Sequence, residues 1–279
     1  MNFPENSPKP ILLFKYGGNA MTNSELQKEV LDQIGRLSHA GYRVVIVHGG
    51  GPFIQETLDE ANIASEFIDG QRKTSFKALR YVEMALKGRV NGELVAKLNL
   101  LGYPAVGLSG KDGKIVTAKK RLHPRDMDGH IEYVDLGQVG DVVSVDTKLL
   151  HLLLENSFLP VITCLASDEQ GLDYNINGDN FAGHLAAALQ VEKYIVLTDV
   201  DGLYRDKDDP GSLISDLRVG EIEGLKAEKV LVGGMIPKID SCITALEGGT
   251  KSAHIINGTV PEEIGRLLLS EGKGTKITR

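Results

Sequence analysis

The sequence predicts an α/β protein in which helices cover both faces of a mostly parallel central sheet, a three-layer αβα sandwich. Short apolar runs of strand length alternate with segments of helical period from one end of the chain to the other. Two of these runs end directly in glycines, as strands do where a tight turn leads into a helix. With 279 residues, 42% of them hydrophobic, the chain is long enough for one large domain or two smaller lobes.

The N-terminal part of the chain alternates strand and helix without interruption. Asn23 or Ser24 caps the first helical segment and Pro52 opens the second, which are common helix starts. The predicted elements are a strand at 11–16, a helix at 24–40, a strand at 43–47, a helix at 53–61, a polar hairpin that ends at 74 and a long amphipathic helix at 75–101.

A β-rich insert at about 103–145 interrupts this alternation before it resumes. We expect an N-terminal lobe at 1–190 and a C-terminal lobe at 191–279. The insert is predicted as strands at 103–108, 114–119, 130–136 and 141–146, followed by a helix at 146–155, a strand at 158–166, a helix at 177–189, a strand at 193–200, a helix from 237 and a strand at 252–258.

Composition excludes several classes of function. A formal charge of −7 without a basic stripe argues against a nucleic-acid binder. No apolar stretch approaches the ~20 residues of a membrane helix, and the N-terminus lacks the features of a signal peptide. Cys164 and Cys242 look like small buried hydrophobes in a reducing compartment. We therefore expect a cytoplasmic protein that binds neither nucleic acid nor membrane.

Two glycine turns are the first candidate for a ligand site. "VVIVHGGGP" ends a strand in Gly49, Gly50 and Gly51, and "FKYGGNA" places Lys15 before Gly17 and Gly18. Neither is a P-loop, and the dinucleotide fingerprint from Gly49 meets isoleucine at its third glycine position. Parallel strands finish at one edge, so both turns would surround an anion with N–H groups and helix N-termini. The alternative is that both are tight turns without a ligand.

Two later stretches point to the same edge. "VLTDVDGLY" at 196–204 puts small and acidic residues at a strand end, which suits a nucleotide's ribose or phosphates. "GGMIPK" delivers Lys238 into the first turn of a helix. Together with Lys15, this aims two cations at one edge from opposite ends of the chain.

The order of these motifs resembles the amino-acid kinase superfamily and, within it, the acetylglutamate kinases. The resemblance extends from Ile11 to Thr278 and rests on "KYGGNAM", "VHGGGP", "DGQRKT", "GLSGKDG", "LGQVGDV", "NINGD", "LTDVDGL", "GGMIPK" and "GT" at 274–275. It implies the amino-acid kinase fold, with acetylglutamate binding and dimerisation in the N-terminal lobe and ATP binding in the C-terminal lobe. The implied reaction is transfer of a phosphoryl group from ATP to the side-chain carboxylate of N-acetyl-L-glutamate, in arginine synthesis.

The resemblance also implies roles for the charged residues. Lys15 and Lys238 would stabilise the transferring group, with Mg²⁺ on the β/γ oxygens, and Asp179 would hold the two lysines. We assign no residue as a protein ligand of the metal. The acceptor carboxylate is already ionised at neutral pH, so no general base is needed. His48 is expected to pack beneath the glycine loop.

Binding roles follow from the same resemblance. Gly50 and Gly51 would offer N–H groups to the substrate, Arg72 would pair with its α-carboxylate in a bidentate contact, and Asn175 would bind its amide or α-carboxylate region. For the nucleotide the resemblance implies Gly17, Gly18, Thr198, Asp199, Gly202, Tyr204, Gly234 and Met235.

The sequence departs from the family at two places. "NINGD" has Gly178 where acetylglutamate kinases often have alanine, and glycine also occurs in the related kinase that acts on carrier-linked aminoadipate. That rival would suit a basic surface for its carrier protein, whereas this chain is acidic. Arginine-inhibited members carry an extra N-terminal helix, and the ten residues before Ile11, three of them proline, are too few for it, so we expect insensitivity to arginine.

Two further expectations remain open. We expect a homodimer across the long helix at 75–101, while the sequence has no pattern that reports a PII-type regulator. The other function class is a non-catalytic binding module on the same fold, which loss of either lysine would have favoured. Both lysines are present.

Overall fold

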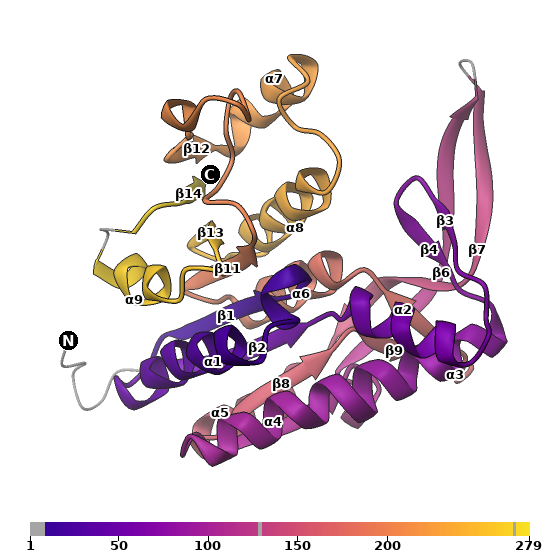
Figure 1. Cartoon of the computed structure of the whole chain (residues 1–279), viewed down its shortest axis with the longest axis horizontal. Coiled ribbons are helices and arrows are strands. Elements are labelled where there is room, and N and C mark those ends of the chain that lie inside the picture. The colour runs from indigo at the N-terminus through magenta and orange to yellow at the C-terminus, as the bar shows by residue number, and fades with distance from the viewer. Residues whose placement is uncertain (1–8, 128–129, 270–271) are drawn as a thin grey trace.

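An eight-stranded sheet forms the centre of the protein in the computed structural model, which describes residues 9–127, 130–269 and 272–279 (Figure 1). The strand order is β12-β14-β13-β11-β1-β2-β8-β5, and every neighbouring pair is parallel except β13 with β14. The strands are β1 (Ile11–Tyr16), β2 (Arg43–His48), β5 (Ala105–Ser109), β8 (Leu159–Thr163), β11 (Lys193–Thr198), β12 (Asp216–Arg218), β13 (Ser252–Asn257) and β14 (Thr275–Thr278).

Helices cover both faces of this sheet, so the expected three layers are present. On one face α1 (Ser24–His39), α4 (Asn91–Leu100) and α9 (Glu262–Leu269) pack over a core that includes Phe14 and Ile46. On the other, α6 (Gly178–Leu189) and α8 (Met235–Glu247) pack over Leu13 and Val45, which point the opposite way because side chains alternate along a strand. The remaining helices are α2 (Gly51–Glu60), α3 (Phe76–Glu83), α5 (Lys148–Glu155) and α7 (Ile222–Ala227).

The long helix predicted at 75–101 forms, but it is not uniformly α-helical. Ser75 caps α3 by accepting a hydrogen bond from the Ala78 N–H. A π-helical stretch, η2 (Met84–Val90), then separates α3 from α4. Apolar periodicity cannot distinguish a π turn from an α turn, so the sequence pattern does not reveal this stretch. Short 3₁₀ turns lie at η1 (Gly18–Met21), η3 (Asp112–Lys114), η4 (Pro210–Ser212) and η5 (Val219–Glu221).

The β-rich insert differs from the prediction. Its first strand, β5, belongs to the main sheet, and the two strands expected at 130–136 and 141–146 are one strand, β7 (His130–Val145), which pairs with β6 (Val116–Met127) in a long hairpin. Gly137, at φ +76°, is accommodated within the strand rather than ending it. Together with β9 (Leu165–Ser167) and β10 (Asp173–Ile176), these strands close a small barrel.

A second hairpin, β3 (Glu66–Ile68) with β4 (Gln71–Lys73), confirms the polar hairpin expected before residue 74. It lies beside the long β6–β7 hairpin (Figure 1), and the Asp69 carboxylate is 3.0 Å from His123 Nε2.

The expected division after residue 190 falls between α6 and β11. The main sheet is continuous across it, because β11 pairs with β1. The N-terminal segment on which the expectation about arginine rests falls mostly at residues 1–8, outside the described residues. Within the described part of the chain, no helix is long and apolar enough to span a bilayer.

Candidate active site

The two glycine turns lie at one edge of the main sheet. β1 and β2 are adjacent and parallel, with Lys15 opposite Val47 and Tyr16 opposite His48. Gly17 and Gly18 follow β1, and Gly18 has a φ of +73°, which favours glycine. The triple glycine follows β2 and leads into α2. Because α2 has no side-chain cap at its N-terminus, the N–H groups of its first turn are left for water or a ligand.

Lys15 and Lys238 converge on one carboxylate, as the sequence predicted. Lys15 Nζ is 3.0 Å from Asp179 Oδ1, and Lys238 Nζ is 3.3 Å from Asp179 Oδ2. Asp179 lies in the first turn of α6, which Asn177 caps through the N–H groups of Asp179 and Asn180. Only 7% of the Asp179 side chain is exposed.

Burial and charge oppose each other in this cluster. Burial by itself raises the pKa of the Asp179 carboxyl, but Lys15 and Lys238 outweigh it and hold that pKa below its ordinary value. The pKa of the Lys238 ammonium is lowered, first by burial and then by the neighbouring charge of Lys15. Asp179 opposes that shift. The carboxylate therefore partly offsets the effect of burial and of Lys15 on the Lys238 ammonium.

A cavity of about 320 Å³ opens on one side of Lys15. Its walls are the triple-glycine loop, the start of α6 and the β3–β4 hairpin, and it contains four of the predicted substrate-binding residues: Gly50, Gly51, Arg72 and Asn175. Ammonium, guanidinium and helix N-termini around one cavity are the groups that bind a multiply charged anion.

Arg72 is held in this cavity by neutral partners. Its Nη1 donates to Gln55 Oε1 at 2.8 Å and to Ser65 Oγ at 2.5 Å, and its guanidinium lies 4.5 Å from the centroid of the Phe67 ring. Among the described residues Arg72 forms no ion pair. Burial lowers its pKa, with the charge of Asp59 acting in the opposite direction. The guanidinium is thus oriented without being neutralised.

A second cavity, of about 400 Å³, shares Lys15, Gly17 and Gly18 with the first. It extends along the end of β11 and the start of α8, where Thr198, Asp199, Gly234, Met235 and Lys238 line it. Lys15 therefore lies between two cavities, and its neighbour Lys238 lines the second of them.

Two predicted nucleotide residues lie outside this cavity's lining. A Cβ on Gly202 would come within 2.6 Å of Thr275 Oγ1, so this glycine permits close packing against β14. The Tyr204 hydroxyl donates to Asp201 at 3.1 Å. The two parts of "LTDVDGLY" therefore differ. Thr198 and Asp199 line the cavity, whereas Gly202 and Tyr204 make contacts within the protein.

Sequence reasoning missed the residues that orient the others. Gln55 and Ser65 lie 17 and 7 positions from Arg72. Short polar side chains at such separations carry no motif. Four buried apolar residues also line the first cavity: Leu86, Val139, Cys164 and Ile176.

Comparison with known proteins shows the family. A model of the amino acid kinase family matches residues 10–257. The chain belongs to that family. Among its relatives in the family are an acetylglutamate kinase from Methanococcus maripaludis, 42% identical over 96% of this chain and 92% of its own length, and one from Moorella thermoacetica, 44% identical over 95% and 90%.

The fold of this family member also resembles solved structures. An N-acetylglutamate synthase from Neisseria gonorrhoeae, complexed with coenzyme A and N-acetyl-glutamate, matches with a TM-score of 0.81 and 25% identity. The match covers 97% of this chain and 59% of that longer protein. Giardia carbamate kinase shares the fold at a TM-score of 0.72 and 17% identity. The sequence-based expectation of the amino-acid kinase fold is confirmed.

Proposed function

We propose that the protein transfers the γ-phosphoryl group of ATP to the side-chain carboxylate of N-acetyl-L-glutamate, the step of arginine biosynthesis that its relatives' name describes. The observation that carries this is the position of Lys15 between two cavities, tied with Lys238 to one buried carboxylate. A carboxylate oxygen attacks the γ-phosphorus, the bond to the β–γ bridging oxygen breaks, and ADP leaves with that oxygen. The product is N-acetyl-L-glutamyl 5-phosphate.

The first cavity suits the acceptor. Arg72, which is oriented but not neutralised, pairs with the α-carboxylate, and Asn175 binds the region of the amide. Gly50 and Gly51 present N–H groups to the substrate from the start of α2. These contacts leave the side-chain carboxylate facing Lys15.

The second cavity suits the nucleotide. Gly17 and Gly18 lie against the phosphates, with Thr198 and Asp199 on one side and Gly234 and Met235 on the other. We retain Gly202 and Tyr204 as residues that support this wall.

Mg²⁺ fits this cavity, because kinases hold the ion largely through phosphate oxygens and water, and the Asp199 carboxylate lines the same space. When bound, the ion neutralises charge on the β/γ oxygens.

Catalysis then consists of positioning and charge. The two ammonium groups offset the repulsion between a carboxylate and a triphosphate and stabilise the charge that spreads over the moving phosphoryl group. Asp179 keeps both lysines in place and takes no proton. The attacking group is an anion at neutral pH, so the reaction needs no base.

Glycine in place of alanine in "NINGD" does not distinguish a kinase of free N-acetyl-L-glutamate from a kinase of a carrier-linked substrate. A Cβ on Gly178 would lie 3.5 Å from Lys15 Cε and 3.8 Å from both Cys164 Sγ and Gly49 Cα, which is ordinary van der Waals contact. Alanine would therefore fit, and glycine at this position is not required by the site. The relatives named acetylglutamate kinase favour the free amino-acid derivative over a carrier-linked one.

The proposed assembly is a cytoplasmic homodimer. Phe76, Met84 and Leu100 are exposed apolar side chains along the helix at 76–100. A second copy covering this stretch would remove them from water. Light scattering on the purified chain should give twice the mass of one chain.

The function is tested by ADP release with four acceptors: N-acetyl-L-glutamate, L-glutamate, L-aspartate and UMP. We expect turnover with N-acetyl-L-glutamate to exceed the other three by at least about 100-fold, because the site binds both carboxylates and the amide. Equal or greater turnover with another acceptor would refute the assignment. ADP release with none would favour the non-catalytic module.

A further inference from the structure

His48 ends β2 directly before the triple glycine, yet the proposed reaction gives it no role. It points to the α4 side of the sheet, because it lies opposite Tyr16, whereas Lys15 points to the other side, where the first cavity lies. The ring is completely buried. It is therefore beneath the loop, as expected, and separated from the substrate by the loop's backbone.

The hydrogen bonds of His48 define which ring nitrogen carries the proton. Asn91 Nδ2 lies 2.9 Å from the Val161 carbonyl oxygen, an obligate acceptor, so this atom is the amide NH₂. The same nitrogen lies 2.9 Å from His48 Nε2, which must then accept. The proton is on Nδ1, and Nδ1 lies 2.9 Å from a second obligate acceptor, the Gly49 carbonyl oxygen. Asn91 therefore donates a hydrogen bond to His48, and His48 donates one to the Gly49 carbonyl oxygen.

The surroundings keep the ring in this neutral form. Burial lowers the pKa of His48 to about 4, the contact with the Gly49 backbone partly offsets this, and the charge of Lys87 lowers it further. The ring thus has one donor and one acceptor at physiological pH, which the two-sided contact requires.

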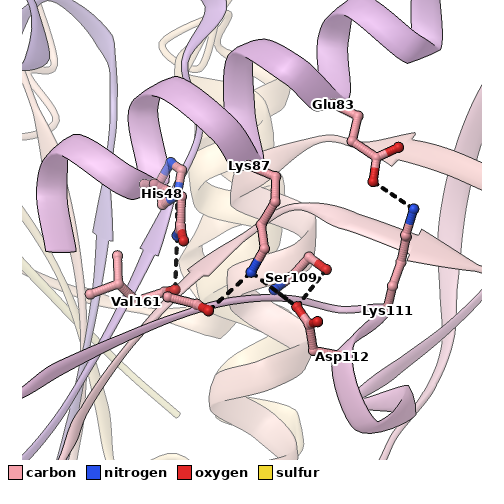
Figure 2. Close-up of polar contacts among 9 residues, drawn as sticks. His48, Glu83, Lys87, Ser109, Lys111, Asp112 and Val161 are labelled. Atoms are coloured by element: carbon pink, nitrogen blue, oxygen red, sulfur yellow. Dashed lines mark hydrogen bonds and ion pairs between the residues drawn. The ribbon is translucent and has the colours of Figure 1, made fainter.

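Side chains from the end of α3 and from the π-helical stretch η2 hold this part of the long helix against the sheet edge near His48. Figure 2 shows Lys87, the nearer of the two to His48, reaching Asp112, and Glu83, farther along the helix, reaching Lys111. Lys87 Nζ is also 3.0 Å from the Gly107 carbonyl oxygen. A side chain at Gly107 would come within 2.2 Å of Asn91 Oδ1, so this glycine makes room for the amide that holds His48.

The contact with Gly49 has a consequence on the opposite side of the loop. In a trans peptide the C=O and N–H point in opposite directions, and none of the described peptides is cis. The Gly49 carbonyl is held on the His48 side, so the N–H of the same peptide, which belongs to Gly50, points to the side of the first cavity. No described protein group accepts from that N–H. A Cβ on Gly50 would come within 2.8 Å of Leu86 Cδ2, so glycine at this position allows the loop backbone to lie close to the helix.

We propose that His48, oriented by Asn91, is a positioning residue that aims the Gly50 N–H at the acceptor substrate by holding the Gly49 carbonyl from behind. The role rests on the proposed function for the identity of the acceptor. His48 touches neither substrate, and its effect passes through one peptide plane.

Two substitutions separate this role from simple packing. An asparagine amide nitrogen occupies the place of imidazole Nδ1. A glutamine amide reaches the place of Nε2, where its oxygen can accept from Asn91 Nδ2. His48→Asn therefore keeps the donor to Gly49, and His48→Gln loses it. Asparagine is the smaller residue and leaves the larger void, so we expect His48→Asn to be the less stable protein in thermal unfolding.

Steady-state ADP release, with N-acetyl-L-glutamate varied at saturating ATP, should give the opposite order. We expect His48→Gln to lower kcat/KM for the acceptor roughly 10- to 100-fold, the value of a hydrogen bond to a charged group, and His48→Asn to stay within about fivefold of wild type. KM for ATP should change less than about twofold in both, because the Gly50 peptide lines only the first cavity. Equal losses in the two variants, or activity that follows stability, would overturn the proposal.

A second measurement needs no substrate. The ¹⁵N spectrum of histidine-labelled wild type at pH 7, with His48 assigned by its absence from His48→Gln, should show a protonated Nδ1 and an unprotonated Nε2. A protonated Nε2 would overturn the proposal even if the enzyme is active. A wild type inactive with N-acetyl-L-glutamate but showing the expected tautomer would instead refute the proposed function.

Discussion

Replacing Asp179 by asparagine tests the charge balance of the site in the most detail. The side chain keeps its size, but the carboxylate that lies 3.0 Å from Lys15 and 3.3 Å from Lys238 becomes neutral. At an effective dielectric constant of about 20, each contact is worth about 5 kcal/mol. An opposite charge at this distance shifts a pKa by about 1 to 3 units. Without it, the pKa of Lys238, already lowered by burial, falls further.

The expected result is a changed pH profile. A lysine acts here in its charged form, which is present below its pKa and lost as the pH rises through it. The kcat of Asp179→Asn should therefore begin to decline at a lower pH than the kcat of wild type, and it should be about 100-fold below wild type at pH 8. Initial rates of ADP release at saturating substrates, measured from pH 5.5 to 9.5, give both profiles.

A matched control removes a carboxylate elsewhere. Asp141→Asn breaks an ion pair with Arg121, at 2.7 Å, outside the lining of both cavities. Its kcat profile should match that of wild type. If Asp179→Asn loses activity equally at every pH, Asp179 does not act by keeping Lys238 charged.

Three further outcomes follow from single residues. Arg72→Lys should raise KM for N-acetyl-L-glutamate roughly 10- to 100-fold and leave KM for ATP unchanged, since a lysine cannot form the bidentate pair; a change in both KM values would contradict this. Gly178→Ala should keep activity within about twofold and raise the free energy of unfolding by about 0.5 kcal/mol, because the methyl fits and glycine costs backbone entropy; denaturant titration that shows destabilisation would exclude it. Burial lowers the pKa of His48 to about 4 and the pKa of His254 to about 3. As the pH falls below about 6.5, these histidines take up protons in the unfolded chain before they do in the folded protein, so the folded protein loses stability. For His48 alone the loss is about 3 kcal/mol by the time the pH reaches its folded pKa. Thermal unfolding should show a Tm that falls between pH 6.5 and 4, and a level Tm across that range would contradict the assignment.

Local signals in the sequence predicted the elements that position the charged groups. Asn177 was expected to open a helix, and it caps α6, which places Asp179 in the first turn. Glycines after two apolar runs predicted that Lys15 and the triple-glycine loop would meet at one sheet edge, and they do. These features depend on residues close in sequence, so spacing reveals them.

Contacts between distant residues were beyond such reasoning. Asn91 and His48 are 43 positions apart, and Asn91 directly follows a π-helical stretch that periodicity does not reveal. Arg72 was predicted as a substrate residue only through the family resemblance, since its partners Gln55 and Ser65 form no pattern with it. These contacts depend on tertiary packing, and local patterns in a single sequence do not reveal how distant segments pack.

Trapping the product tests the central claim most directly. An acyl phosphate reacts with hydroxylamine to give a stable hydroxamate, so wild type with ATP, N-acetyl-L-glutamate and hydroxylamine should form hydroxamate in step with ADP. N-acetyl-L-glutamine, whose side chain ends in an amide, should give none, and Lys238→Ala should lower the rate by about 100-fold or more. ADP release without hydroxamate, or an unchanged rate in Lys238→Ala, would contradict phosphoryl transfer to a carboxylate between these two lysines.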